Sequence, residues 1–234
     1  MSERLTLTDD GAAALAAEAL RHVASGQVVG LGTGHAATAF VRALGARVAA
    51  GLDVRGVPTS EATAALARGL GIKLLSPDDV ETIDVAVDGA DEIDPRADLI
   101  KGYGGALLRE KVVATMARRF VVLAGAEKLV PVLGTRGRLP VEVVPFAAAP
   151  CRRRVEALGY PPTLRASEGR PVVTDNGNLL LDCRVGPIAD PPGLEAALRA
   201  IPGLVGTGLF LGMHPTVLVW DGARLRTLRP EGLN

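Results

Sequence analysis

The amino-acid sequence predicts an α/β protein, with a Rossmann-like parallel sheet that carries helices on both faces and a small α+β subdomain. Strand-like and helix-like segments alternate between Thr8 and Ala124, and the 28 glycines and 16 prolines are typical of a chain with many turns. After Gly134 the pattern changes to proline-bounded strands, which indicates a separate subdomain. We expect an α/β domain formed by residues 1–133 and 209–234, and an α+β subdomain at residues 134–208.

The N-terminal segment has the order helix, strand, glycine turn, helix. Apolar residues at helical spacing end at Gly26, and a short apolar run then leads into the sequence Gly32-Thr33-Gly34-His35. The expected elements are a helix at 8–24 with Asp9 or Asp10 as its N-cap, a strand at 27–31, and an alanine-rich helix that follows the turn and runs to about Leu44.

The same alternation continues to Ala124. Short apolar runs are separated by helical segments, and Thr59-Ser60 provides the cap of one helix. Strands that alternate with helices at this spacing form a parallel sheet, and such sheets bind ligands at the carboxyl ends of their strands. The expected strands are 53–58, 72–75, 83–88, 99–101 and 120–124, and the expected helices are 61–69 and 106–118.

The stretch after Gly134 is rich in strands. Asn and Gly tolerate positive φ, so Asp175-Asn176-Gly177 predicts a hairpin turn between two of them. We expect a ferredoxin-like arrangement here, and we expect the last strands to return to the main sheet. The expected strands are 139–145, 172–174 and 178–181, the helices are 152–158 and 192–200, and the returning segments are 209–211 and 217–220.

Composition and charge exclude several classes of function. The 26 basic and 26 acidic residues give a net charge of zero, and only 3% of residues are aromatic, so we expect no nucleic-acid partner and no membrane surface. The chain has no run of about eighteen apolar residues and no secretory signal order, which favours a cytoplasmic location. Cys151 and Cys183 lack metal-ligand spacing and are expected to be buried thiols. The expected partner is a small neutral or anionic molecule.

The glycine turn is the first candidate for chemistry. It lies between a strand and a helix, where backbone N–H groups and the helix dipole hold anions such as phosphate, and a simple tight turn explains it equally well. Its spacing fits neither a dinucleotide fingerprint nor a P-loop. His35 by itself is more often a surface or capping residue than a catalyst.

Two further clusters follow predicted strands. The acidic run from Asp88 to Asp94 fits a divalent metal site, carboxylates that hold sugar hydroxyls, or a solvated turn. Lys101-Gly102-Tyr103-Gly104-Gly105 places a lysine beside backbone amides that suit an oxyanion. Glu110 lies in the first turns of the next helix, where a surface residue paired with its neighbours is the alternative.

Six motifs in order along the chain resemble ribose-5-phosphate isomerase, type A. Any one of them is weak evidence, but the ordered series covers nearly the whole chain and is highly specific. The motifs are Gly-Leu-Gly-Thr-Gly at 30–34, Gly-Val-Pro-Thr-Ser at 56–60, Asp-Gly-Ala-Asp-Glu at 88–92, Ile-Lys-Gly-Tyr-Gly-Gly-Ala-Leu-Leu-Arg-Glu-Lys at 100–111, Pro-Val-Glu-Val-Val-Pro at 140–145 and Thr-Asp-Asn-Gly-Asn at 174–178.

The resemblance implies an enzyme that interconverts ribose 5-phosphate and ribulose 5-phosphate without metal or cofactor, as a homodimer or homotetramer. It implies that Glu110 is the proton acceptor and that Lys101 stabilises the oxyanion of an enediolate. Asp88 and Asp91 then orient hydroxyl groups and assist opening of the sugar ring. The implied substrate-binding residues are Thr33, Gly34, His35, Ala36, Asp88, Gly89, Ala90, Asp91, Lys101, Gly102, Tyr103, Gly104 and Lys128.

The sequence departs from the family pattern in three ways. His35 and Ala36 stand where the family has Ser-Thr, no lysine precedes Lys73, and Glu127 changes the motif before Lys128. A protonated His35 would replace part of the lost attraction for phosphate, so substrate affinity would fall as pH rises. The expected consequence is weaker phosphate binding with intact chemistry.

Other functions stay open on the sequence alone. The altered phosphate turn is compatible with a non-catalytic sensor of sugar phosphates. A related sugar-phosphate deaminase or lactonase is a second alternative. A metal-dependent hydrolase built on the acidic run is the least favoured, because none of the three histidines lies near that run in the sequence.

Overall fold

The computed structural model describes residues 7–228, and the chain forms two compact units. The first unit is built from residues up to Ala90, from Arg109–Leu129, and from residues after Gly212. The second is built from Asp91–Leu108 and Val130–Gly212. The sequence analysis assigned residues 91–108 to the main domain. They belong instead with the second unit, because their short strands pair there and the Lys101 N–H donates to the Gly208 carbonyl at 2.9 Å.

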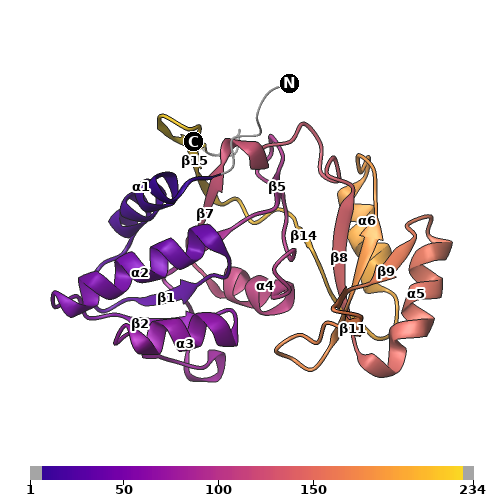
Figure 1. The fold of residues 1–234 in the computed structure, drawn as a ribbon, viewed down its shortest axis with the longest axis horizontal. Coiled ribbons are helices and arrows are strands. Elements are labelled where there is room, and N and C mark those ends of the chain that lie inside the picture. The colour runs from indigo at the N-terminus through magenta and orange to yellow at the C-terminus, as the bar shows by residue number, and fades with distance from the viewer. Residues whose placement is uncertain (1–6, 229–234) are drawn as a thin grey trace. The chain divides into compact units, whose positions relative to one another are not determined.

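A seven-stranded sheet forms the centre of the first unit (Figure 1). Its strand order is β16-β15-β7-β4-β1-β2-β3, and every neighbouring pair is parallel except β15 and β16. The predicted parallel sheet is therefore confirmed. The bounds are β1 Val28–Leu31, β2 Arg55–Pro58, β3 Lys73–Leu74, β4 Val85–Gly89, β7 Phe120–Gly125, β15 Thr216–Trp220 and β16 Leu225–Leu228.

Helices cover both faces of this sheet, as predicted. One face packs on α1 (Asp9–Ala19), α2 (His35–Ala49) and α3 (Glu61–Gly69) through a shared core of aliphatic side chains and Phe40. The other face carries α4 (Leu107–Met116), whose Val113 lies against Gly30 and Ala86. Short 3₁₀ turns connect the elements at Leu20–His22, Pro77–Asp79, Ala126–Lys128 and Pro145–Ala147.

Several helix ends differ from the sequence prediction, those of α1 and α2 among them. Thr8, rather than Asp9 or Asp10, caps α1, and its hydroxyl accepts a hydrogen bond from the Gly11 N–H at 3.2 Å. The α2 helix continues five residues past Leu44 to Ala49, and Gly51, which adopts a positive φ of 102°, follows its end.

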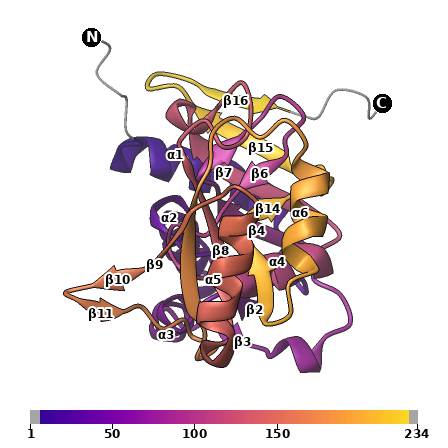
Figure 2. The same ribbon diagram turned by 90° about the vertical axis from the view of Figure 1, so that its right-hand side faces the viewer.

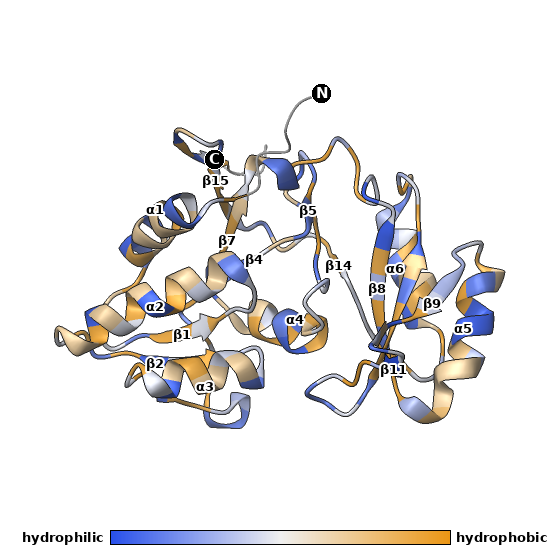
Figure 3. Ribbon diagram, viewed as in Figure 1, coloured by the Kyte–Doolittle hydropathy of each residue, from blue (hydrophilic) through white to orange (hydrophobic). Residues whose placement is uncertain are grey.

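The second unit contains a four-stranded antiparallel sheet of order β13-β8-β12-β9. The chain order β8, α5, β9, β12, α6, β13 is the βαββαβ pattern of ferredoxin-like folds, as expected. The middle of α5 is polar, where Arg152, Arg153 and Arg154 are exposed (Figure 3). The bounds are β8 Arg138–Val143, α5 Ala148–Ala157, β9 Pro162–Leu164, β12 Leu179–Arg184, α6 Pro191–Arg199 and β13 Leu204–Thr207.

The predicted hairpin at 172–181 is wrong in part. Val173 makes only an isolated bridge to Leu179, and no strand forms at 172–174. The turn instead folds over the buried Glu142 of β8, whose Oε1 accepts from the side chains of Thr174, Asn176 and Asn178 at 2.9–3.0 Å. A hairpin lies earlier in the chain, where β10 (Ala166–Ser167) pairs with β11 (Arg170–Pro171). These two strands form a separate small sheet that projects outward after β9 (Figure 2).

The expected return of residues 209–211 to the main sheet is also wrong. Residues Leu209–Phe210 form β14, which pairs with β6 (Leu99–Ile100) beside β5 (Glu92–Ile93) in a three-stranded sheet of the second unit. Only the following strand, β15, joins the parallel sheet. A two-residue strand carries too little pattern to reveal its partner.

Both cysteines are free and buried, as predicted. Burial raises the pKa of the Cys183 thiol to about 12 and raises the pKa of Cys151 as well. These thiols therefore stay protonated at neutral pH, and a protonated thiol is a poor nucleophile. Within residues 7–228, no helix is long and apolar enough to cross a membrane.

Candidate active site

The carboxyl ends of β1 and β4 meet at the glycine turn of the first unit. The Gly32 N–H donates to the Val87 carbonyl at 2.9 Å and so joins the turn to β4. Asp88, near the end of β4, is only 3% exposed. Its Oδ1 accepts from the N–H groups of Thr33 at 3.1 Å and Gly89 at 2.8 Å. Two backbone donors therefore fix the orientation of this carboxylate.

Gly32 allows the close approach of the turn to Asp88. A Cβ atom at position 32 would lie 2.6 Å from the Cα of Asp88, closer than van der Waals contact permits. Gly32→Ala is therefore expected to lower the free energy of unfolding by about 1–3 kcal/mol, the usual cost of overpacking. Urea denaturation measures this change. Gly69→Ala is the control, because a Cβ there meets no atom within 4 Å, and an unchanged midpoint for Gly32→Ala would contradict the packing argument.

A cluster of hydroxyl groups from the start of α3 and the residues before it is hydrogen-bonded to the glycine turn. Thr33 Oγ1 lies 2.8 Å from Thr59 Oγ1, 2.9 Å from Ser60 Oγ and 3.2 Å from Thr63 Oγ1. Thr63 Oγ1 also donates to the Gly32 carbonyl at 3.0 Å. The sequence analysis treated Thr59 and Ser60 only as a helix cap and missed this role. The Gly-Val-Pro-Thr-Ser motif was the available signal.

The start of α2 is suited to an anion. Gly34 is its N-cap with φ of 104°, and no side chain caps the first amides, whereas Ser60 and Asp190 cap α3 and α6. The exposed His35 lies beside these amides, with its Nε2 3.5 Å from Asp9 Oδ1. Unsatisfied N–H groups and a positive helix end together favour a phosphate.

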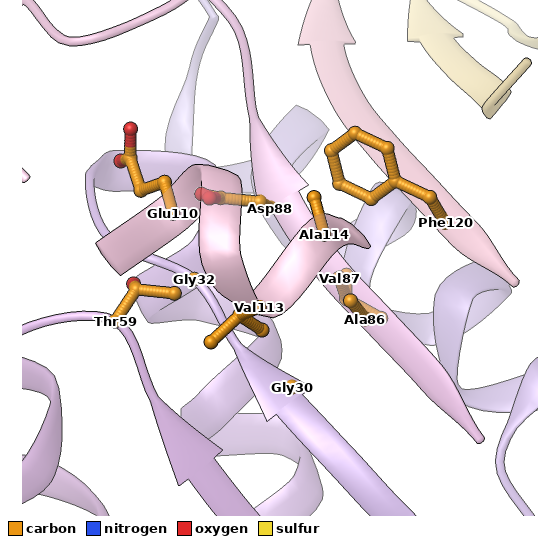
Figure 4. Close-up of a pocket in the computed structure, with 10 residues that line it drawn as sticks. All are labelled: Gly30, Gly32, Thr59, Ala86, Val87, Asp88, Glu110, Val113, Ala114 and Phe120. Carbon is orange, nitrogen blue, oxygen red and sulfur yellow. The ribbon is translucent and has the colours of Figure 1, made fainter. Parts of the chain in front are cut away.

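Glu110 of α4 lines the same small pocket as Asp88 (Figure 4). Its side chain is buried, with a residue exposure of 5%. The empty space among its lining atoms, with the adjoining open solvent included, is about 150 Å³, and it is too narrow to hold a water molecule. Two buried carboxylates among largely apolar neighbours form an arrangement suited to proton transfer. The lining residues are Gly30, Gly32, Thr59, Ala86, Val87, Asp88, Glu110, Val113, Ala114 and Phe120.

The second unit holds the other predicted catalytic residues. Lys101 is 3% exposed, and its Nζ lies 5.5 Å from the centroid of the Phe210 ring, a cation–π arrangement. The Tyr103 N–H donates to Asp91 Oδ2 at 2.9 Å. Gly102, with φ of 107°, allows the sharp turn between Lys101 and Tyr103. The structure therefore brings Asp91 together with the loop that carries Lys101.

The acidic run divides into site residues and structural residues. Glu92 is fully buried and accepts from the N–H groups of Gly134 at 2.6 Å and Arg136 at 2.8 Å. Asp94 accepts from the backbone of Arg96 and Asp98 and so closes a turn. Across residues 7–228, no three His, Cys, Asp or Glu side chains are grouped to hold a metal ion.

The remaining predicted site residues lie at the edges of these clusters. In the first unit, Gly89 and Ala90 follow Asp88, Ala36 is buried in the first turn of α2, and Lys128 ends the 3₁₀ turn after β7. In the second unit, Gly104 is exposed in the loop after Lys101. The predicted residues of the first unit lie in three places: the glycine turn with the start of α2, the end of β4, and the start of α4. They are Thr33, Gly34, His35, Ala36, Asp88, Gly89, Ala90 and Glu110.

Comparisons with known proteins agree on one activity. A family model for ribose 5-phosphate isomerase A (phosphoriboisomerase A) matches residues 55–223. Ribose-5-phosphate isomerase A of Roseiflexus sp. (strain RS-1) is 58% identical over 207 residues, which cover 87% of this chain and 89% of the relative. The relative from Bradyrhizobium diazoefficiens is 46% identical over 231 residues, covering 93% and 95%.

Solved structures of the same name share the fold. Ribose 5-phosphate isomerase A from Methanocaldococcus jannaschii matches with a TM-score of 0.89 and 39% identity, covering 94% of this chain and 99% of that one. A D-ribose-5-phosphate isomerase in complex with phospho-erythronic acid matches with a TM-score of 0.89 and 37% identity, covering 93% and 97%.

Proposed function

Because this chain belongs to the ribose 5-phosphate isomerase A family, we propose that Glu110, Lys101, Asp88 and Asp91 carry out its reaction. The enzyme interconverts ribose 5-phosphate and ribulose 5-phosphate, a step of the pentose phosphate pathway. The sensor alternative is not favoured, because relatives that are 46–58% identical over most of the chain are isomerases. The observation that supports the residue assignment best is the pairing of buried Asp88 and Glu110 in one pocket.

Glu110 is the proposed base. The reaction moves a proton between C1 and C2 through an enediolate. Glu110 takes the proton from C2 of the open-chain aldose and returns it to C1, while the proton of the C2 hydroxyl passes to the C1 oxygen. The same carboxylate thus serves as base and then as acid, so one group completes the isomerisation.

Lys101 is the proposed electrostatic stabiliser of the enediolate oxygen. A fixed ammonium group beside the amides of residues 102–104 stabilises negative charge that develops only in the transition state. Asp88 and Asp91 are proposed to orient the sugar hydroxyls and to assist ring opening. Both carboxylates accept hydrogen bonds from backbone N–H groups, and these bonds hold them in defined orientations.

The phosphate is proposed to bind Thr33, Gly34, His35 and Ala36 at the start of α2, with Lys128 as a further donor. The uncapped amides of α2 support this assignment. The relative bound to phospho-erythronic acid holds a phosphorylated sugar acid, which carries the same terminal anion as the substrate. Phospho-erythronic acid is therefore a suitable binding probe for this enzyme.

The proposed reaction needs no metal or cofactor. Conversion of ribose 5-phosphate to ribulose 5-phosphate in the presence of a chelator tests this directly. Undiminished turnover after exhaustive chelation is expected. Loss of turnover that returns on adding a divalent cation would contradict the proposal.

His35 is expected to make substrate affinity depend on pH. A protonated imidazole beside the uncapped amides of α2 attracts phosphate and a neutral one does not, so this attraction is lost as pH rises. An exposed ion pair contributes up to about 1 kcal/mol, so His35→Asn is expected to raise KM about two- to fivefold near pH 5.5 and to leave it unchanged near pH 8.

The ratio of the two KM values at each pH is the measurement. Titration of the substrate phosphate affects both proteins equally and cancels in this ratio. His214→Asn is the control, because His214 is exposed and its positive φ of 47° is one that asparagine tolerates. A ratio that stays flat from about pH 5.5 to about pH 8 would assign no charge role to His35.

Assembly and location are further proposals. A homodimer or homotetramer is proposed because the chain belongs to this isomerase family. Light scattering gives the mass that tests this assembly. A cytoplasmic location is proposed from the metabolic role, and cell fractionation tests it.

A further inference from the structure

Arg165 connects the small sheet of the second unit to the loop that carries Lys101. It lies between β9 and β10, and its side chain is 13% exposed. Its Nε donates to Asp182 Oδ2 at 2.9 Å, and its Nη2 donates to Asp182 Oδ1 at 2.5 Å. Its Nη1 donates to the carbonyl groups of Gly102 and Tyr103, each at 3.1 Å. One guanidinium group therefore holds both a strand carboxylate and two successive loop carbonyls.

The loop held by Arg165 is tightly folded. The Gly102 carbonyl also accepts the Gly105 N–H at 3.1 Å, and both glycines have positive φ. Lys101 precedes the held carbonyls directly, and the Tyr103 N–H donates to Asp91 Oδ2. The peptide group between Gly102 and Tyr103 thus accepts from Arg165 through its carbonyl and donates to Asp91 through its N–H, and Lys101 is the residue before Gly102.

A second arginine, Arg138, packs against the ring of Tyr103. The guanidinium carbon of Arg138 lies 3.8 Å from the ring centroid, and the Tyr103 hydroxyl donates to the Arg138 carbonyl at 3.0 Å. Burial, with smaller contributions from Glu92 and Asp91, raises the pKa of Tyr103 to about 12, so the hydroxyl remains a donor. Arg138 Nε lies 3.8 Å from Asp182 Oδ1, so Asp182 is shared by both arginines.

We propose that Arg165, oriented by Asp182, is a positioning residue that holds Lys101 and Asp91 in their catalytic geometry. The inference rests on the proposed roles of Lys101 and Asp91 and extends them to residues that touch no substrate. Arginine suits this role because its planar fork donates in several directions at once. Lysine cannot reproduce two bonds to a carboxylate and two bonds to carbonyls from one rigid group.

Arg165→Ala is expected to lower kcat about 100-fold with little change in KM, because a misplacement of about 1 Å in a catalytic group has an effect of this size. Guanidinium chloride at a concentration that does not denature the protein is expected to restore several-fold activity, and ammonium chloride is not. Arg165→Lys is expected to remain impaired. Arg184→Ala, an exposed arginine of the same strand as Asp182, is the control with unchanged kcat.

Chemical rescue separates positioning from general stability. A kcat of Arg165→Ala within twofold of the parent overturns the inference, and so does a loss that tracks a lower melting temperature without guanidinium rescue. If Arg165→Ala does not fold, Asp182→Asn decides the matter, because it keeps the arginine and weakens its orientation. Reduced kcat with a native circular dichroism spectrum then supports the inference, and parental kcat overturns it.

Parallel variants distinguish failure of this inference from failure of the proposed site. If Lys101→Ala and Asp91→Asn both lose activity while Arg165→Ala keeps it, only the positioning role is wrong. If Lys101→Ala and Asp91→Asn both keep activity, the catalytic assignment itself is wrong.

Discussion

Glu110→Gln is expected to lower kcat for ribose 5-phosphate isomerisation by about 10²–10⁴-fold, the range that general base catalysis supplies. Glutamine has nearly the same shape, but its amide cannot accept a proton from C2 of the substrate. Glu110 is buried in the pocket that contains Asp88, so we expect no solvent-exposed side chain to take over its role as base. Initial rates at saturating substrate measure the change.

Binding and folding controls complete this test. Phospho-erythronic acid is expected to bind Glu110→Gln as it binds the parent, because the substitution removes proton transfer and leaves the phosphate site unchanged. Glu156→Gln, an exposed glutamate of α5, is the matched control with parental kcat. If Glu110→Gln retains more than a tenth of the parental kcat and folds normally, another group is the base.

Lys101→Ala is expected to lower kcat by about 10²–10³-fold, the usual loss when one oxyanion donor is removed. The Lys101 ammonium is desolvated against Phe210, and a charge in such a setting acts strongly on a developing oxyanion. Because this charge is needed most in the transition state, kcat and kcat/KM are expected to fall together while KM changes less.

A steady-state comparison of both parameters checks this expectation. Lys73→Ala is the control, since Lys73 is exposed on the edge strand β3. A rise in KM with unchanged kcat would make Lys101 a binding residue for the ground state and would exclude an oxyanion role.

The parallel sheet was predictable because its signals are local. The α3 helix occurs at the predicted residues, since Ser60 caps its start and Gly71, with a positive φ of 77°, follows its end. Residues 209–211 and 172–174 were misassigned for the opposite reason. The pairing of Leu209–Phe210 depends on β6, more than 100 residues away, and the Asn-rich turn is fixed by the buried Glu142. Such contacts leave no periodicity in the sequence.

The site was predictable where chemistry requires particular side chains. Carboxylates and a lysine beside glycines indicate hydroxyl and oxyanion binding, so Asp88 and Lys101 could be proposed from residue type, whereas the base role of Glu110 was proposed only through the family resemblance. Arg165 could not be selected, because two of its partners are backbone carbonyls, which every residue carries, and nothing in the sequence marks Asp182 as the third. The hydroxyl cluster behind Thr33 was hidden for a similar reason, since Thr59 and Ser60 read equally well as a helix cap.

The two buried thiols make this protein a convenient scaffold for fluorescence labelling. Maleimide dyes react with exposed thiolates, whereas Cys151 and Cys183 are both buried and have raised pKa values. One cysteine introduced on the surface of each unit would then be labelled without first removing the native thiols.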